Sequence, residues 1–117
     1  PAVQPTINEP VFEKTVNSAF IGTDLENRLR TRGISNLVIA GLTLEHCIST
    51  SVRMASNLGF NVVLVPDATA AFDKIGHDGN KYSADIIFYA ELASLKDEFA
   101  TIKDTETILN KLDKSYK

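Results

Sequence analysis

The sequence is short of several residue types, and each shortage excludes a class of protein. It contains one cysteine, Cys47, and no tryptophan among 117 residues. One cysteine cannot form an intrachain disulfide or a zinc site made of cysteines alone, and we expect a reducing, cytoplasmic location. No apolar run approaches the ~20 residues that cross a bilayer, so we expect no membrane partner.

Positive charge is also scarce, which bears on nucleic acid. The 12 lysine and arginine residues are scattered along the chain, and the net charge is −3. Nucleic-acid binding usually requires a basic patch or stripe, so we expect no nucleic-acid partner. The hydrophobic content of 44% and charged content of 23% are ordinary for a globular protein. We therefore expect residues 1–117 to form a single domain with a modest core.

Strands and helices are predicted to alternate from residue 11 onward. Residues 1–10 hold three prolines and are expected to form an extended connector. The apolar run 36–41 predicts a strand that is covered on both faces. The expected strands are 11–14, 36–41, 61–65 (ended by Pro66) and 99–102; the expected helices are 24–32, a helix from Cys47 to Leu58, 84–95 and one from Asp104 or Thr105 to Lys114, with a polar loop at 72–80. This order predicts an α/β fold with a parallel sheet.

Cys47 has the position of a nucleophile. It follows the strand at 36–41 and is expected in the first turn of the next helix. Unpaired N–H groups and the dipole at a helix start favour a thiolate, and parallel sheets bind ligands at the carboxyl edge of their strands. Gly41 allows a tight turn there, and backbone N–H groups of 43–47 could converge on an oxyanion. A lone cysteine is more often a small buried hydrophobic residue, but this position favours catalysis.

The other ionisable residues are expected to differ in their relation to Cys47. Neighbours on a helix point about 100° apart, so His46 is expected to line the pocket or pack rather than accept the thiol proton. His77 lies in the polar loop, and two histidines without metal-ligand spacing lead us to expect no metal and no other cofactor. Glu45 complements the helix dipole. Lys14 is either a solvated residue or a cation that stabilises a thiolate.

Three stretches of the chain match one known family in residues and spacing. They are 13–20 with Thr23 and Leu25, 37–47 continued by 53–59, and 65–73 with Gly76 and Gly79. The stretch 92–101 is similar too. Together they resemble the isochorismatase-like cysteine hydrolase superfamily, which includes nicotinamidases and related amidohydrolases, over residues 11–109.

The resemblance implies a fold and a set of catalytic residues. The implied fold is a three-layer αβα, Rossmann-like architecture with a mainly parallel sheet. Cys47 is implied as the nucleophile and Lys14 as the catalytic lysine. A cis peptide bond is implied between Leu42 and Thr43, with the Thr43 and Cys47 amides forming the oxyanion hole. We also expect Phe20, Leu44 and His46 to line the substrate pocket.

The resemblance further implies a reaction and an assembly. Family members attack a carboxamide or related carbonyl of a small molecule, release ammonia or an amine, and hydrolyse the resulting thioester. We expect no cofactor among the residues of this chain, since the ligands of those members that bind a metal lie in the portion missing here. Family members commonly form homo-oligomers. We therefore expect a small-molecule amide as substrate and a second copy of the chain as partner.

Two departures from the family pattern matter. Leu44 stands where the family commonly has threonine, so a hydroxyl is missing from the cysteine loop. The family's third catalytic residue is an aspartate on its first strand, and no residue among 1–13 fits that strand. We therefore expect this chain to be the C-terminal portion of the hydrolase domain, paired with a missing N-terminal segment that supplies the aspartate.

Two other readings stay open beside the cysteine amidohydrolase. The departures at Leu44 and at the first strand favour a catalytically silent protein of the same fold, used for ligand binding or subunit assembly. A flavodoxin-like or receiver-type module also fits the alternation of strands and helices. That module is disfavoured because the chain has neither a phosphate loop nor an acidic cluster at its strand ends. Reactivity of the Cys47 thiol discriminates the first two readings.

Overall fold

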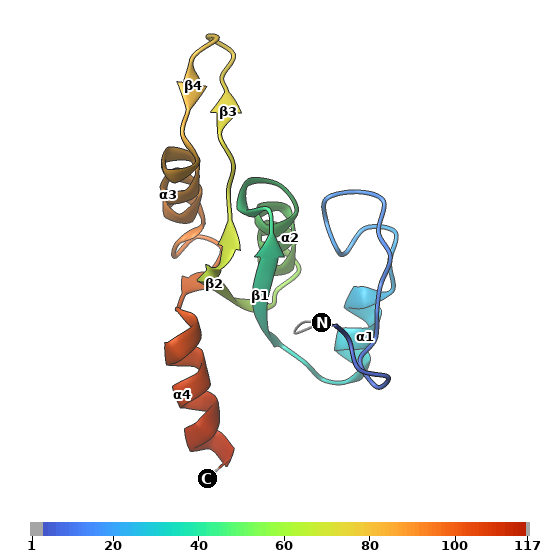
Figure 1. The fold of residues 1–117 in the computed structure, drawn as a ribbon. Coiled ribbons are helices and arrows are strands. Elements are labelled where there is room, and N and C mark those ends of the chain that lie inside the picture. The colour runs from blue at the N-terminus through green and yellow to red at the C-terminus, as the bar shows by residue number, and fades with distance from the viewer. Residues whose placement is uncertain (1–3, 117) are drawn as a thin grey trace.

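A computed structural model of the chain describes residues 4–116 and shows a mixed α/β fold with a parallel sheet, as predicted (Figure 1). The three-stranded sheet has the order β1-β2-β5, and both neighbouring pairs are parallel. A separate antiparallel pair, β3 and β4, forms an arm that projects from the body. The strands are β1 (Asn36–Leu42), β2 (Asn61–Ala70), β3 (Lys74–Ile75), β4 (Lys81–Tyr82) and β5 (Thr101–Ile102).

The helices lie close to where the sequence predicts them. They are α1 (Leu25–Thr31), a π-helical turn η1 (Leu44–Ile48), α2 (Ser49–Asn57), α3 (Ala84–Leu95) and α4 (Thr105–Tyr116). The glycines that follow α1 and α2, Gly33 and Gly59, have φ of +68° and +94°, a conformation that glycine adopts without strain. Ser83 caps α3, since its hydroxyl accepts a hydrogen bond from the Ile86 amide at 3.3 Å.

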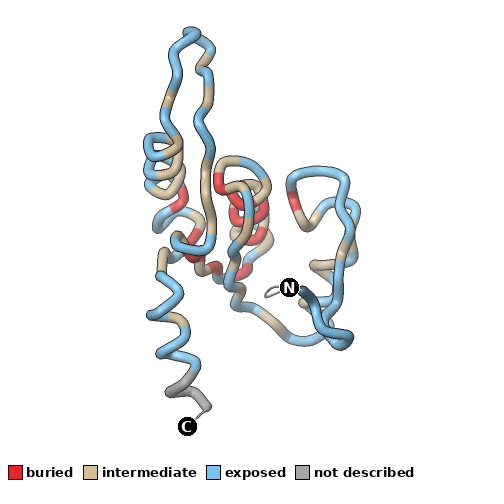
Figure 2. Tube along the Cα trace, viewed as in Figure 1, coloured by how far each residue is buried: buried red, intermediate tan, exposed pale blue. Residues whose placement is uncertain are grey.

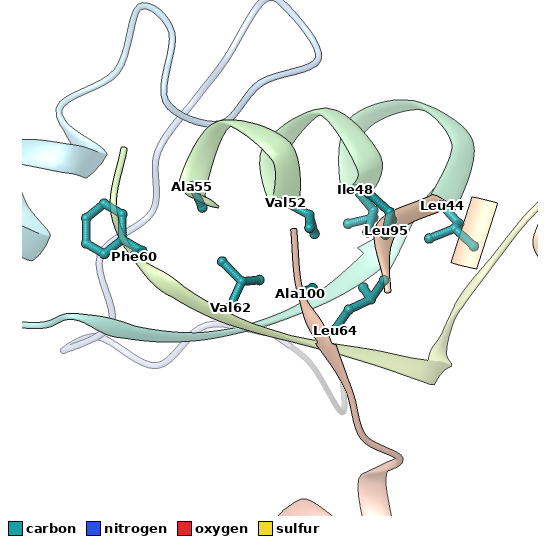
Figure 3. Packing of buried hydrophobic residues seen from close by; sticks show 9 residues of the cluster. All are labelled: Leu44, Ile48, Val52, Ala55, Phe60, Val62, Leu64, Leu95 and Ala100. Carbon is teal, nitrogen blue, oxygen red and sulfur yellow. The ribbon is translucent and has the colours of Figure 1, made fainter. Parts of the chain in front are cut away.

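The core lies between α2 and the sheet (Figure 3). Val52 and Ala55 point from α2 toward Val62 and Leu64 of β2, and all four side chains are buried. Alternate positions of β2 face this core because side chains on a strand point to opposite faces in turn. The remaining members of the cluster come from η1, the end of α2 and the α3–β5 region: Leu44, Ile48, Phe60, Leu95 and Ala100.

Three expectations about the strands are wrong. Residues 11–14 form no strand, and they belong to an irregular segment that precedes α1. Pro66 does not end its strand: β2 continues to Ala70, because a register shift after Ile39 lets Gly41 pair with Thr69. The polar loop at 72–80 contains β3 and is continued by β4, so it folds as a hairpin arm.

The expected covering of β1 on both faces is also wrong. Its residues alternate between exposed and half-buried, and Val38 is 59% exposed (Figure 2). Leu37 and Ile39 pack against the core, whereas Val38 and Leu42 point away from it. Among the residues that the structure describes, β1 pairs with β2 alone, so its other edge is free. No helix within this part of the chain is long and apolar enough to cross a membrane.

Leu64 provides a test of the core. Its side chain is fully buried, and we expect Leu64→Ala to lower the free energy of unfolding by about 2–5 kcal/mol because it leaves a cavity. Urea unfolding followed by circular dichroism measures this loss. The matched control is Leu109→Ala on α4, where the side chain is more than half exposed and the loss should stay below about 1 kcal/mol. Equal losses in both variants would contradict the assignment of the core.

Candidate active site

Folding brings Lys14 and Cys47 together across 33 positions of sequence. Lys14 Nζ lies 3.2 Å from Cys47 Sγ, within hydrogen-bonding distance for sulfur. The same ammonium donates to the Val16 carbonyl at 2.9 Å, which fixes the turn of the segment that carries it. An ammonium at this distance stabilises a thiolate by direct charge attraction.

Cys47 lies in a π-helical turn and not in an α-helix. The turn η1 begins one residue after Thr43, whose carbonyl accepts hydrogen bonds from the His46 and Ile48 amides, both at 3.2 Å. The peptide bond between Leu42 and Thr43 is cis. Single π-turns occur frequently at functional sites because they alter the direction of side chains relative to a regular helix.

A hydrogen bond from the Ala19 amide to Ser51 attaches the lysine segment to the helix that follows Cys47. Ser51 Oγ on α2 accepts the Ala19 amide at 3.0 Å, and the neighbouring Ser18 is buried. Asn17 also reaches the site, since its Oδ1 lies 3.7 Å from Cys47 Sγ and accepts from the thiol. Sequence reasoning missed Asn17 and Ser51, because neither carries a recognisable catalytic signal. The only clue in the sequence is that Asn17 follows Lys14 by three residues and Ser51 follows Cys47 by four.

A cavity of about 390 Å³ opens beside Lys14 and Cys47. It runs along the free edge of β1, between that strand and the segment that includes α1. Phe20 lines it together with Leu25 and Leu29 from α1. Apart from Lys14, Cys47 and Ser51, its lining side chains are apolar, as is common in pockets that bind small molecules.

Two residues expected in the pocket are elsewhere. The side chain of Leu44 is fully buried in the core cluster, so it cannot contact a substrate. His46 is absent from the cavity lining and contacts the arm instead, with its Nε2 at 3.0 Å from Lys74 Nζ. An ammonium has only donors, so the imidazole nitrogen accepts in this contact. Neither residue therefore lines this cavity: Leu44 lies in the core, and His46 packs against a neighbouring element, which is the second of the two places expected for it.

Glu45 has a larger role than dipole compensation. Its side chain is only 8% exposed, and Oε2 accepts from the Phe72 amide at 3.1 Å and pairs with Lys74 Nζ at 3.3 Å. Burial raises the pKa of Glu45, but the nearby backbone N–H of Glu45 and hydroxyl of Thr43, with the bonds from Phe72 and Lys74, outweigh it and lower the pKa to about 2. This carboxylate connects the cysteine turn to the base of the arm.

The described residues also bear on metal binding. Nowhere in this part of the chain do three or more histidine, cysteine, aspartate or glutamate side chains lie close enough to hold a metal ion. The residues that surround Cys47 offer charge stabilisation by the Lys14 ammonium and a hydrogen bond to Asn17, both of which suit a nucleophilic thiol.

Comparisons with known proteins agree on one family. The family model described as the isochorismatase domain matches residues 1–107. The isochorismatase family protein YrdC of Bacillus subtilis is 46% identical over 114 residues, which cover 97% of this chain and 61% of YrdC. The ureidoacrylate amidohydrolase RutB of Agrobacterium fabrum is 37% identical over 67 residues, 57% of this chain and 29% of RutB.

The same family appears among solved structures. A putative hydrolase of the isochorismatase family from Chromobacterium violaceum superposes with a TM-score of 0.94 and 41% identity. The superposition covers 97% of this chain and 59% of that protein. The chain thus spans about three fifths of the length of this relative and of YrdC.

Glu45 provides a test that depends on pH. Because its folded-state pKa lies below the ordinary 4.5, the carboxylate contributes its full stability above about pH 5 and loses it as the pH falls toward 2. We expect Glu45→Gln to lower the free energy of unfolding by about 1–3 kcal/mol at pH 7 and by less at pH 3. Urea unfolding at both pH values measures the difference. Glu98→Gln, at an exposed position, is the matched control. A Glu45→Gln effect that is equal at both pH values would count against the assignment.

Proposed function

Because the chain belongs to the isochorismatase family, we propose that Cys47 is the nucleophile of a cysteine hydrolase that cleaves an amide-type C–N bond of a small molecule. The observation that carries the proposal is the 3.2 Å contact between Lys14 Nζ and Cys47 Sγ at the mouth of an apolar cavity. The amidohydrolase RutB and the streptothricin hydrolase of Streptomyces noursei, which is 37% identical over 71 residues, make this the reaction class to test first.

The first step forms a covalent intermediate. The Cys47 thiolate attacks the carbonyl carbon, and the electron pair of the C=O bond moves to oxygen to give a tetrahedral oxyanion. We assign the backbone amides of Thr43 and Cys47 as its hydrogen-bond donors, with the ammonium of Lys14 close enough to add positive charge. Collapse of the oxyanion expels the nitrogen, which leaves as ammonia or an amine when it takes up the proton that the Cys47 thiol had given to the general base.

The second step frees the enzyme. Water adds to the thioester carbonyl, a general base removes its proton, and the Cys47 thiolate leaves as the carboxylic acid forms. Within the described chain, no carboxylate lines the cavity, so this base is not found among its lining residues. We propose that an aspartate on a strand outside these residues supplies it, and that this strand pairs with the free edge of β1.

A catalytically silent relative is the second candidate function. The absence of a carboxylate from the described lining of the cavity favours it, because an apolar cavity of this kind also suits simple ligand binding. In a silent relative, nothing would require Cys47 to be activated as a thiolate. Reactivity of Cys47 therefore separates the two candidates.

Removal of the nucleophile tests the reaction. The protein expressed from the complete reading frame that contains this chain should release ammonia from at least one amide in a panel of small carboxamides and ureido compounds. We expect Cys47→Ala to lower that turnover at least about 1,000-fold, because no covalent intermediate can form. Ser56→Ala, near the far end of α2, is the control and should retain the activity. Unchanged turnover in Cys47→Ala would end the catalytic assignment.

Removal of the ammonium tests the Lys14–Cys47 pair. We expect Lys14→Met to slow alkylation of Cys47 by iodoacetamide at pH 7 by about 3–10-fold, because the thiolate loses its nearest positive charge. Lys96→Met, at the end of α3, is the matched control and should alkylate at the wild-type rate. Mass spectrometry of the modified thiol follows both reactions. A wild-type rate in Lys14→Met would favour the silent protein.

A further inference from the structure

A second polar side chain besides Lys14 reaches the sulfur of Cys47. Asn17 Oδ1 lies 3.7 Å from Cys47 Sγ, and Lys14 Nζ lies 3.2 Å from the same atom. The two side chains belong to one irregular segment of the chain and are three positions apart. The proposed reaction uses the ammonium but not the carboxamide, although both groups contact the nucleophilic atom.

The two groups suit different protonation states of Cys47. An ammonium has only donors, so Lys14 can donate to the sulfur but cannot accept a hydrogen bond from the thiol. A carboxamide oxygen has only acceptor lone pairs, so Asn17 Oδ1 accepts a hydrogen bond from the S–H group. The resting thiol is thus held at two points, with its lone pairs toward Lys14 and its proton toward Asn17.

Contacts on both sides of Asn17 hold its backbone in place, although the residue itself is exposed. The carbonyl of the residue before it accepts a hydrogen bond from Lys14 Nζ at 2.9 Å. After it, Ser18 is buried, and the Ala19 amide donates to Ser51 Oγ on α2 at 3.0 Å. Because α2 follows directly on the turn that carries the nucleophile, these contacts fix the position of Asn17 relative to the sulfur.

Asn17 contacts the nucleophile but not the space beside it. In the described chain, Lys14 and Cys47 both line the cavity, whereas Asn17 is absent from its lining. A cysteine side chain can occupy three staggered positions about χ1, and attack on a carbonyl carbon requires the sulfur to lie about 3–3.5 Å from that carbon. A hydrogen bond that favours one position therefore increases the fraction of Cys47 that is ready to attack.

We propose that Asn17 is a positioning residue, which accepts the hydrogen bond of the Cys47 thiol and so keeps Sγ oriented for attack beside Lys14. This inference rests on the proposed function, since it takes Cys47 to be the nucleophile. An S–H group is a weak donor, so we expect a moderate effect on the rate. Release of the thiol into three equally populated rotamers would slow attack about 3-fold, and a preference for another rotamer would slow it further.

The pH profile of Cys47 alkylation tests whether Asn17 contacts the thiol. In the protein from the complete reading frame, Asn17→Ala should shift the midpoint of the iodoacetamide rate profile down by about 0.3 pH units, because a hydrogen bond to the neutral thiol favours that form. Asn17→Asp should shift the midpoint up by about 1 pH unit, because a carboxylate beside the sulfur disfavours the thiolate. Asn27→Ala and Asn27→Asp, on the exposed surface of α1, are the matched controls and should keep the wild-type midpoint. An unchanged midpoint in Asn17→Asp, or shifts of both Asn17 variants in the same direction, would overturn the proposal.

Steady-state kinetics test whether the same contact positions the sulfur. With an amide that the wild-type protein hydrolyses, Asn17→Ala should lower kcat about 3–10-fold and leave KM within about 2-fold, because the lost contact is with the nucleophile and not with the substrate. Asn27→Ala is again the control and should keep both constants. A wild-type kcat in Asn17→Ala, with or without a raised KM, would contradict a positioning role. Failure to hydrolyse any amide would contradict the proposed function instead, and the alkylation profiles, which need no substrate, would still decide whether Asn17 contacts the thiol.

Discussion

The packing of α2 against β2 is the contact on which the candidate site depends. Val52 and Leu64 meet in this contact with no exposed surface, which fixes the helix over the sheet. The turn that carries Cys47 runs directly into α2, and Ser51 of α2 holds the backbone of the lysine segment at Ala19. Both halves of the Lys14–Cys47 pair are therefore attached to one helix, although one of them lies in irregular chain.

Local sequence signals predicted the parts of the fold that depend on near neighbours. The helices expected at 24–32 and 84–95 and the strand before Cys47 each rely on residues within a few positions. The predictions of strands were wrong where a partner that is distant in the sequence determines the structure. The register shift that extends β2 past Pro66 depends on pairing with β1, and residues 11–14 have no strand beside them to pair with.

The same distinction applies to the site. The position of Cys47 between a strand and a helix indicated a nucleophile. Only the resemblance to a family indicated that Lys14 is catalytic, since a lone lysine carries no local signal. The partners of Glu45 lie 27 and 29 positions away at the base of the arm, so its sequence neighbours could not indicate them. His46 faces Lys74 for the same reason: Lys74, at the base of the arm, lies 28 positions further along the chain.

Water exclusion links the free edge of β1 to the chemistry. Lys14 is exposed in the described chain, and an exposed ion pair is worth at most about 1 kcal/mol because water screens it. The same 3.2 Å contact becomes stronger as the local dielectric constant falls. A strand paired with β1 would close the open side of the cavity and remove water from this pair. It would thus strengthen the attraction between the ammonium and a thiolate, even apart from any side chain that it brings.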